Sequence, residues 1–286
     1  MGRPPISPDT DHLHLIYERM VDGIIIVDAW GVIVLANPAA TRMLQGRTGT
    51  LVGAPFGFPI ADRHAAVIDL ITDRNGPRVA EMRVSEVEWQ GQPARLLNLR
   101  DITEQTTLNR QLERLANFDF VTGLPNRSRF ARRLERAMTE SRRHGGLIAL
   151  LFIDLDDFKS INDEHGHDVG DTFLRLVGQR LEALLREEDS VARIGGDEFS
   201  VLLIQLKHPR EAEVVANKIV ENLALPFHVG ELTIQSGASL GISLFPQDAD
   251  AGDVLMRRAD LAMYEAKKLG KGKYRFYSMA ADQGAV

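Results

Sequence analysis

The sequence of 286 residues contains no cysteine. Disulfide bridges and thiolate metal sites are therefore excluded, and the absence fits a reducing cytoplasm. No apolar run approaches the ~18 residues needed to cross a bilayer, and the first eleven residues lack the basic start and apolar core of a signal peptide. An excess of positive charge is also missing: the net charge is −6 and the pI is about 5.8. This argues against a nucleic-acid partner or an anionic membrane surface, so phosphate binding would have to be local.

The composition is that of a soluble globular protein, with 44% hydrophobic and 26% charged residues. The length suffices for two ordinary domains, each with its own core. The sequence shows neither a domain-scale repeat nor a low-complexity tract.

Two glycines followed by two acids stand at the centre of the second half of the chain. Gly195 and Gly196 separate two β-branched segments, which predicts two strands joined by a tight turn because paired glycines supply positive φ angles. Asp197 and Glu198 would project from this hairpin at an edge of the sheet. Alone, such a pattern is more often a solvated turn than a functional site.

A second acidic stretch favours a functional site. The continuous apolar run 147–153 is typical of a central strand buried on both faces, and it ends in the acids 154, 156 and 157. Carboxylates at the end of a buried strand are hard oxygen ligands of the kind that Mg²⁺ prefers. Together the two stretches predict a site for a divalent metal and a nucleotide.

Five motifs in a fixed order resemble the GGDEF domain of diguanylate cyclases. They are DFVTGLPNR (119–127), FIDLDDFKSIND (152–163), GHDVGD (166–171), GGDEF (195–199) and YEAKKLGK (264–271). The resemblance implies an α+β domain with a ferredoxin-like nucleotidyl-cyclase core, in which helices pack on a mainly antiparallel sheet. It also implies condensation of two GTP molecules into cyclic di-GMP with release of two pyrophosphates, one GTP being held by each domain of a homodimer.

The resemblance assigns the acids to metal binding and catalysis. The Asp154 side chain, the Leu155 carbonyl and the Asp197 carboxylate would hold Mg²⁺ or Mn²⁺, with Glu198 as a supporting ligand. Asp197 is also the candidate for activating the attacking ribose hydroxyl. Lys159 matches a residue that stabilises charge on the reacting phosphate.

The resemblance assigns other polar residues to the nucleotide. Asn162 and Asp171 match the guanine readers, and His167 would lie near the nucleotide. Position 171 is expected in the first turn of a helix, where an acid is also favoured for ordinary capping reasons. Lys267 and Lys271 would bind the β and γ phosphates, although without the motif they are simply the basic end of a helix. Position 271 is often arginine in the family, so lysine there loses bidentate geometry.

The pair Arg186 and Asp189 precedes the hairpin at the spacing of the family's RxxD site for product inhibition. An arginine can bind phosphate or the Hoogsteen edge of guanine, and a carboxylate can accept from guanine N1 and N2. Two residues near a helix end can also occur together by accident.

The first half of the chain resembles a PAS sensory domain. A short helix with Leu13 and Ile16 on one face leads into two β-branched runs, and later segments 79–89 and 93–100 alternate like antiparallel strands around Gln90-Gly91. Asn37 and the closing segment 101–104 match residues that are typical of that family. PAS pockets hold haem, flavin, small acids or nothing; the ligand here is unknown, and cysteine-adduct flavin chemistry is excluded. His64 stands where a haem-ligating helix could lie, but a single histidine is more often a surface residue.

Leu108, Leu112 and Leu115 are spaced four and three apart in an otherwise polar segment, which predicts a short coiled coil between two copies rather than an ordinary surface helix. The expected organisation is a flexible N-terminus (1–11), a PAS domain (12–103), a coiled-coil linker (104–118), the GGDEF domain (119–279) and a C-terminal tail (280–286).

Three functions remain open at this stage. The first is an active, PAS-regulated cyclase, and the second is a catalytically silent GGDEF module that binds GTP or cyclic di-GMP and regulates a fused or partner phosphodiesterase. The third is a protein-interaction sensor dominated by its PAS domain. Degenerate GGDEF domains usually lose acids of the hairpin, whereas Asp154, Lys159, Asp197 and Glu198 are all present, which favours the enzyme. Because a phosphodiesterase domain often follows in this family, the sequence leaves open whether the chain is a piece of a longer protein.

Overall fold

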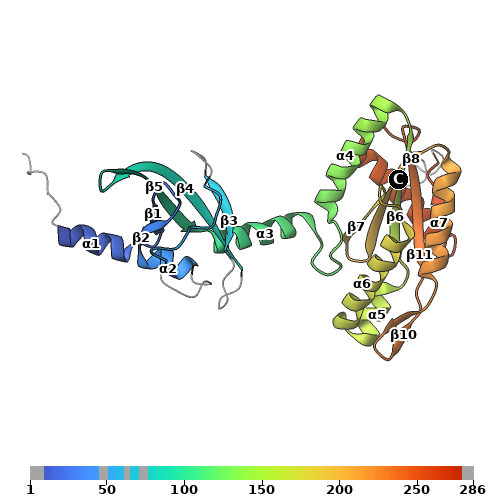
Figure 1. The fold of residues 1–286 in the computed structure, drawn as a ribbon. Coiled ribbons are helices and arrows are strands. Elements are labelled where there is room, and N and C mark those ends of the chain that lie inside the picture. The colour runs from blue at the N-terminus through green and yellow to red at the C-terminus, as the bar shows by residue number, and fades with distance from the viewer. Residues whose placement is uncertain (1–9, 45–50, 61–64, 71–76, 279–286) are drawn as a thin grey trace, which may run out of the picture. The chain divides into compact units, whose positions relative to one another are not determined.

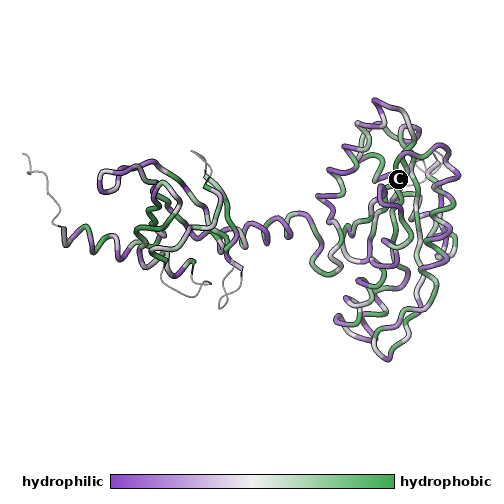
Figure 2. The backbone as a smooth tube through the Cα atoms, in the orientation of Figure 1, coloured by the Kyte–Doolittle hydropathy of each residue, from purple (hydrophilic) through white to green (hydrophobic). Residues whose placement is uncertain are grey.

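The computed structural model describes residues 10–44, 51–60, 65–70 and 77–278. The chain forms two compact units, Met1–Gln111 and Leu112–Val286. Each unit has its own buried apolar core, as Figure 2 shows by the green segments inside both. The expected flexible N-terminus up to residue 9, the haem-ligand candidate His64 and the expected C-terminal tail 280–286 lie outside the described residues.

The first unit is built on a five-stranded antiparallel sheet in the order β2-β1-β5-β4-β3 (Figure 1). Its elements are α1 (Thr10–Arg19), β1 (Gly23–Val27), β2 (Ile33–Ala36), α2 (Pro38–Leu44), β3 (Ala66–Leu70), β4 (Arg78–Trp89) and β5 (Gln92–Asp101). Helix α2 begins at Pro38, which fits because proline suits the first helical position.

The turn that the sequence predicted between β4 and β5 is confirmed. Gln90 and Gly91 both adopt positive φ angles, 53° and 78°, and the strands pair in register on either side. The helix considered around His64 is wrong where the chain is described, because residues 66–70 pair with β4 as strand β3. Their β-branched residues, Val67 and Ile68, fit a pleated strand better than a helix.

Asn37 joins several parts of the first unit. Its side chain is fully buried, and its Oδ1 accepts hydrogen bonds from the backbone N–H of Ile24 and Ala40 at 3.0 and 2.8 Å. Its Nδ2 donates to the carbonyl of Asp22 at 2.9 Å and more weakly to that of Tyr17 at 3.4 Å. The amide therefore caps α2 and ties it to β1 and the end of α1.

Helix α3 (Thr103–Asn117) matches the predicted linker helix, and the boundary between the two units falls within it. None of its residues is buried. Its three leucines are 54%, 55% and 69% exposed at positions 108, 112 and 115.

The second unit is a five-stranded sheet in the order β12-β11-β6-β8-β7, antiparallel except for the β11-β12 pair. The strands of this sheet are β6 (Leu147–Leu155), β7 (Ser190–Gly195), β8 (Glu198–Leu206), β11 (Ala238–Phe245) and β12 (Tyr274–Phe276). Strands β9 (Phe227–Val229) and β10 (Leu232–Ile234) form a separate two-stranded sheet. The helices of this unit are α4 (Arg127–His144), α5 (Phe158–His165), α6 (His167–Leu184), α7 (Pro209–Leu223) and α8 (Gly252–Lys268). The small β9-β10 hairpin was not predicted, because its strands have three residues each.

Strand β6 is buried along its whole length, as its continuous apolar run predicted. Alternate residues face opposite sides of the sheet. Those at 147, 149, 151, 153 and 155 pack with α6 and α7, whereas those at 148, 150 and 152 pack with α4 and α8. The sheet is thus covered on both faces, and the acids that follow β6 emerge at its end.

The hairpin at Gly195 and Gly196 differs from the expectation in one detail. Only Gly196 adopts a left-handed φ, 54°, while Gly195 ends β7 and pairs with Glu198. One positive φ is enough because the register shifts between Arg193 and Gly195.

Within the described residues, no helix combines the length and apolar character of a membrane span.

Candidate functional site

The predicted acids meet where β6 ends beside the start of β8. Asp154 is the cross-strand partner of Glu198, and the backbone N–H of Leu155 donates to the Asp197 carbonyl at 3.2 Å. Asp154 is 8% exposed, while Asp197 and Glu198 are half-buried. The fold therefore brings together the four residues that the sequence assigned to metal binding, although 42 to 44 positions separate the two stretches.

The electrostatics of this cluster favour a cation. Burial raises the pKa of the Asp154 carboxyl, and the neighbouring Asp197 charge raises it further. Burial also raises the pKa of Glu198, with further contributions from Asp260 and Asp154. Asp260 lies on α8 and was not predicted as part of the site; its own pKa is raised by burial. The ionised acids repel one another, and a bound cation would relieve that repulsion.

Helix α8 supplies lysine charges to the cluster. Gly241 on β11 allows the close approach, because a Cβ there would stand 1.9 Å from the Ala259 carbonyl oxygen. Lys267 in the last turn of α8 then reaches the site, with its Nζ 2.6 Å from Asp154 Oδ1. Lys271 lies in the following loop, and its Nζ donates to Asp157 Oδ1 at 2.7 Å, which raises the pKa of Lys271. Both predicted phosphate ligands are thus paired with acids at the end of β6.

The residues present fit Mg²⁺. In the described ranges, no three histidine or acidic side chains already converge as metal ligands. Proteins usually hold Mg²⁺ in nucleotide sites through one or two carboxylates, the remaining ligands being water and substrate phosphates. Asp154 and Asp197, with the Leu155 carbonyl, are a hard oxygen set of this kind, and surplus negative charge surrounds them.

The predicted guanine readers come together at the corner between α5 and α6. The two helices are in contact and share Gly166, which ends α5 and precedes α6. Asn162 Oδ1 stands only 1.9 Å from the place where a Cβ on Gly170 would lie. Asp171 follows Gly170 directly and is half-buried. The Asn162 amide therefore lies against the residue that precedes Asp171 in α6.

The structure also bears on the alternative explanation for Asp171. Helix α6 begins at His167, so Asp171 is its fifth residue and lies beyond the first turn, in contrast to the sequence expectation. The acid of the first turn is Asp168. A helix-start role thus belongs to Asp168, which leaves Asp171 without that explanation.

The two remaining nucleotide candidates are exposed. His167 is the first residue of α6, and Lys159 lies in the first turn of α5, immediately after the acids of β6. Both are free to contact a ligand that lies over the end of the sheet.

Arg186 and Asp189 lie in the turn before β7 and line a surface pocket with Glu187 and Ser190. Asp189 also has a structural task, because its carboxylate accepts from the backbone N–H of Arg186 at 3.4 Å and of Ile204 at 3.3 Å. Burial raises the pKa of Asp189. The Arg186 side chain is exposed, so it is the freer of the two to bind a ligand.

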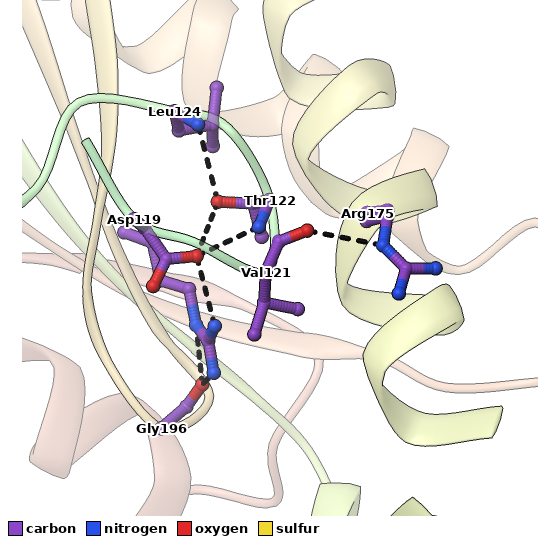
Figure 3. A network of polar contacts seen from close by, with 7 residues as sticks. Asp119, Val121, Thr122, Leu124, Arg175 and Gly196 are labelled. Atoms are coloured by element: carbon purple, nitrogen blue, oxygen red, sulfur yellow. Dashed lines mark hydrogen bonds and ion pairs between the residues drawn. The ribbon is translucent and has the colours of Figure 1, made fainter. Parts of the chain in front are cut away.

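A polar network that the sequence did not predict supports the hairpin from behind (Figure 3). Arg193 donates to the Gly196 carbonyl through Nε and Nη2 at 2.9 and 2.7 Å, and through Nη1 to Asp119 Oδ1 at 3.0 Å. Asp119 also accepts from the N–H and hydroxyl of Thr122 at 2.8 and 2.7 Å. These bonds lower the pKa of Asp119 against the opposing effect of burial. The DFVTG motif therefore braces the turn that carries Asp197.

Comparison with known proteins gives the family. The family model described as "Diguanylate cyclase, GGDEF domain" matches residues 116–273. MucR of Pseudomonas aeruginosa, named a bifunctional diguanylate cyclase/cyclic di-GMP phosphodiesterase, is 40% identical over 183 residues, which cover 64% of this chain and 27% of MucR. The diguanylate cyclase TpbB of the same species is 42% identical over 168 residues, which cover 58% of this chain and 39% of TpbB.

A solved structure that comprises only the GGDEF domain of Pseudomonas aeruginosa TpbB has 40% sequence identity to this chain and a TM-score of 0.57. It covers 58% of this chain and 97% of that one. The chain thus spans well under half the length of these two curated relatives, and the similarity concentrates in the second unit. Since the matched family model covers more than half of the 286 residues, the chain belongs to the diguanylate cyclase GGDEF domain family.

Proposed function

We propose that the chain is a diguanylate cyclase, which as a homodimer condenses two GTP molecules into cyclic di-GMP and two pyrophosphates. The observation that carries this proposal is the meeting of Asp154, Asp197 and Glu198 beside Lys267 at the end of β6. Members that have lost catalysis would have no need to keep this complete set of acids.

Each of the two condensation steps forms one bond and breaks another. The 3′ oxygen of one GTP attacks the α-phosphorus of the other, the bond from that phosphorus to the α,β-bridging oxygen breaks, and pyrophosphate leaves. The hydroxyl proton passes to the Asp197 carboxylate. Mg²⁺ held by Asp154, Asp197 and the Leu155 carbonyl would neutralise phosphate charge.

The charged residues around the acids suit a triphosphate. Lys267 and Lys271 are paired with Asp154 and Asp157, so each lysine has its Nζ at the strand end where phosphates would lie. Binding of the triphosphate exchanges these carboxylate partners for phosphate oxygens. Lys159 would stabilise charge on the reacting phosphate.

Guanine selection belongs to Asn162 and Asp171, with His167 beside the nucleotide. The amide can pair with O6 and the carboxylate with the N1 and N2 donors of guanine. The close fit of Asn162 against Gly170 supports this role, because it holds the amide in place before GTP arrives.

The homodimer would form through α3. Leu108, Leu112 and Leu115 repeat at heptad spacing, and all three are more than half exposed on a helix that buries none of its residues. A second copy of α3 would cover this apolar stripe, as in a parallel coiled coil. Pairing at the stalk brings two active sites to one dimer, which the reaction needs because each domain holds one GTP.

The first unit is proposed to be a PAS sensory domain that regulates the cyclase. The strand order β2-β1-β5-β4-β3, with helix α2 between β2 and β3, supports this assignment. The buried Asn37 is a second support, because it links α1 to the sheet. The input signal would be a bound cofactor or a small acid, or the domain would act without a ligand.

Product inhibition is proposed at Arg186 and Asp189. The exposed guanidinium and the adjacent pocket suit a guanine base or phosphate of cyclic di-GMP. The half-buried Asp189 would accept from guanine while it keeps its backbone contacts.

The second candidate function is a silent regulatory module. It is favoured by the name of NbdA of Pseudomonas aeruginosa, a cyclic di-GMP phosphodiesterase that is 36% identical to this chain over 167 residues. Such a module would bind GTP or cyclic di-GMP without turnover.

The deciding experiment incubates the purified chain with GTP and Mg²⁺ and follows cyclic di-GMP by chromatography and pyrophosphate by a coupled assay. Appearance of both products in a 1:2 ratio supports the cyclase. Binding of GTP without either product, also after addition of candidate PAS ligands, would contradict it and favour the silent module.

A further inference from the structure

Asp156 is a buried carboxylate for which the proposed reaction has no use. It lies two residues after Asp154, directly past the end of β6, and its side chain is 6% exposed. Burying a carboxylate is costly unless its oxygens accept hydrogen bonds. The contacts that offset this cost indicate what the residue does.

Asp156 joins three segments that are far apart in the sequence. Its Oδ1 accepts from the Ser239 hydroxyl on β11 at 2.8 Å, and its Oδ2 accepts from the backbone N–H of Gly272 at 3.0 Å. Its backbone N–H donates to the Gly237 carbonyl at 2.9 Å, and its carbonyl accepts from the Ser236 hydroxyl at 2.9 Å. The end of β6, the start of β11 and the loop after α8 are thereby fixed to one another.

The space around Oδ2 is closely fitted. A Cβ on Gly237 would lie 2.9 Å from Asp156 Oδ2 and 3.8 Å from the Gly272 Cα. The Asp156 carboxylate can therefore lie this close to the backbone at Gly237 only because Gly237 has no side chain.

The loop that Asp156 holds has an unusual backbone. Gly270, Lys271 and Gly272 all adopt positive φ angles, 108°, 56° and 59°. The left-handed region is unfavourable for lysine and persists only where surrounding contacts impose it. The hydrogen bond from Gly272 to Asp156 and the ion pair of Lys271 with Asp157 are such contacts.

We propose that Asp156 is a positioning residue for the triphosphate site: it anchors Gly272 and so keeps Lys271 in its left-handed conformation beside the end of β6. The inference rests on the proposed function in that Lys271 is taken as a phosphate ligand. Asp156 itself touches neither the nucleotide nor the metal. Its carboxylate acts through the loop, and it fixes the distance between that loop and the strand end that carries Asp154.

The test compares Asp156→Ala and Asp156→Asn in the full chain, with Asp163→Ala as the matched control, because Asp163 is an exposed acid on the neighbouring α5. Asparagine has the shape of aspartate; its Oδ1 can accept from Gly272, and its Nδ2 can donate to the Ser239 oxygen. Two readouts are used. One is hydrogen exchange of the 269–273 loop, and the other is binding of a GTP analogue with a methylene bridge between the α and β phosphates, measured with Mg²⁺.

In Asp156→Ala, we expect exchange of the Gly272 amide to become at least ~10-fold faster and the analogue to bind about 10-fold more weakly. Asp156→Asn should restore both values to within about threefold of the unmodified chain, and Asp163→Ala should change neither. If Asp156→Ala does not fold, Ser239→Ala and Asp156→Asn provide the comparison: a smaller loss of protection at Gly272 is expected in the first and near-complete retention in the second.

Unchanged Gly272 exchange in a folded Asp156→Ala variant would refute the anchor. Faster exchange with unchanged analogue affinity would refute the positioning role. If the unmodified chain neither binds the analogue nor makes product, the proposed function fails, and the exchange readout still decides whether Asp156 holds the loop.

Discussion

Replacement of Gly170 by alanine tests the guanine site with a single methyl group. The new Cβ would stand 1.9 Å from Asn162 Oδ1 and 3.0 Å from its Cγ. Since ordinary contact begins near 3.4 Å, the amide oxygen must retreat by about 1.5 Å, the difference between these two distances. That displacement would break the proposed hydrogen bond to the base, and a lost bond of this kind costs roughly 1–3 kcal/mol, or about 5-fold to 160-fold in GTP affinity.

The fold should tolerate this change. Gly170 lies inside α6, where alanine is favoured over glycine by about 1 kcal/mol, and its φ is not in the left-handed region. The third contact of the new methyl group, Phe158 Cζ at 3.4 Å, is ordinary. Any loss of affinity would therefore report on Asn162 rather than on unfolding.

The assay is calorimetric titration of GTP and of inosine triphosphate, which lacks the 2-amino group, with thermal unfolding measured in parallel. Gly178→Ala is the matched control on the same helix, because its Cβ would meet only the tip of Leu124 at 3.1 Å and the Cβ of Thr122 at 3.7 Å. We expect weaker GTP binding in Gly170→Ala and unchanged binding in Gly178→Ala. A folded Gly170→Ala variant that binds GTP as tightly as the unmodified chain would refute the placement of Asn162 in the guanine site.

Four further outcomes are expected. Asp197→Ala should abolish turnover while the melting temperature stays within a few degrees; measurable cyclic di-GMP would show that Asp197 is dispensable. Arg186→Ala should relieve inhibition in initial-rate assays with added cyclic di-GMP, and an unchanged inhibition constant would leave the residue without that role. Asn37→Ala should destabilise the first unit by about 2–4 kcal/mol in urea unfolding, because it orphans several buried backbone groups; a loss under 1 kcal/mol would contradict this. Since the pKa values of Asp154 and Glu198 are raised, protons should compete with Mg²⁺ at a higher pH than the usual carboxyl range near 4. Turnover at limiting Mg²⁺ should therefore fall as the pH is lowered towards that range. The same raised pKa values make protonation of Asp154 and Glu198 favour the folded chain as the pH falls. Melting curves at each pH separate the loss of Mg²⁺ binding from any change in stability.

The sequence predicted the parts of the site that depend on local pattern. The apolar run of β6 is long and unbroken, so both its buried position and the emergence of Asp154 at its end followed directly. The β4-β5 turn was equally clear, because Gln90-Gly91 separates two alternating segments. The predicted positive φ at Gly195 was wrong, since a register shift let the strand continue one residue further than composition indicates.

Other parts depend on contacts between distant segments. Gly170 belongs to the GHDVGD motif, but its close contact with Asn162 appears only in the structure. Asp156 read as one more acid in an acidic stretch, whereas its partners Ser239 and Gly272 lie 83 and 116 residues away. No periodicity links positions at such separations, so their pairing could not have been predicted from pattern alone.

Lys267 and Lys271, at the end of α8 and in the loop that follows it, show how these two kinds of information combine. A basic helix end is favoured by the helix dipole alone, and on that ground Lys267 and Lys271 need no ligand. The dipole explains a charge near the helix end, but it does not explain why Lys267 Nζ lies 2.6 Å from Asp154, or why Lys271 pairs with Asp157 from a left-handed backbone. A left-handed backbone is unfavourable for lysine, and an ion pair between exposed side chains adds little stability. The pair with Asp157 therefore does not by itself account for the loop conformation. The hydrogen bond from Gly272 to the buried Asp156 is the second contact that holds the loop, and a ligand-binding role for Lys271 would explain why a lysine stands at this strained position.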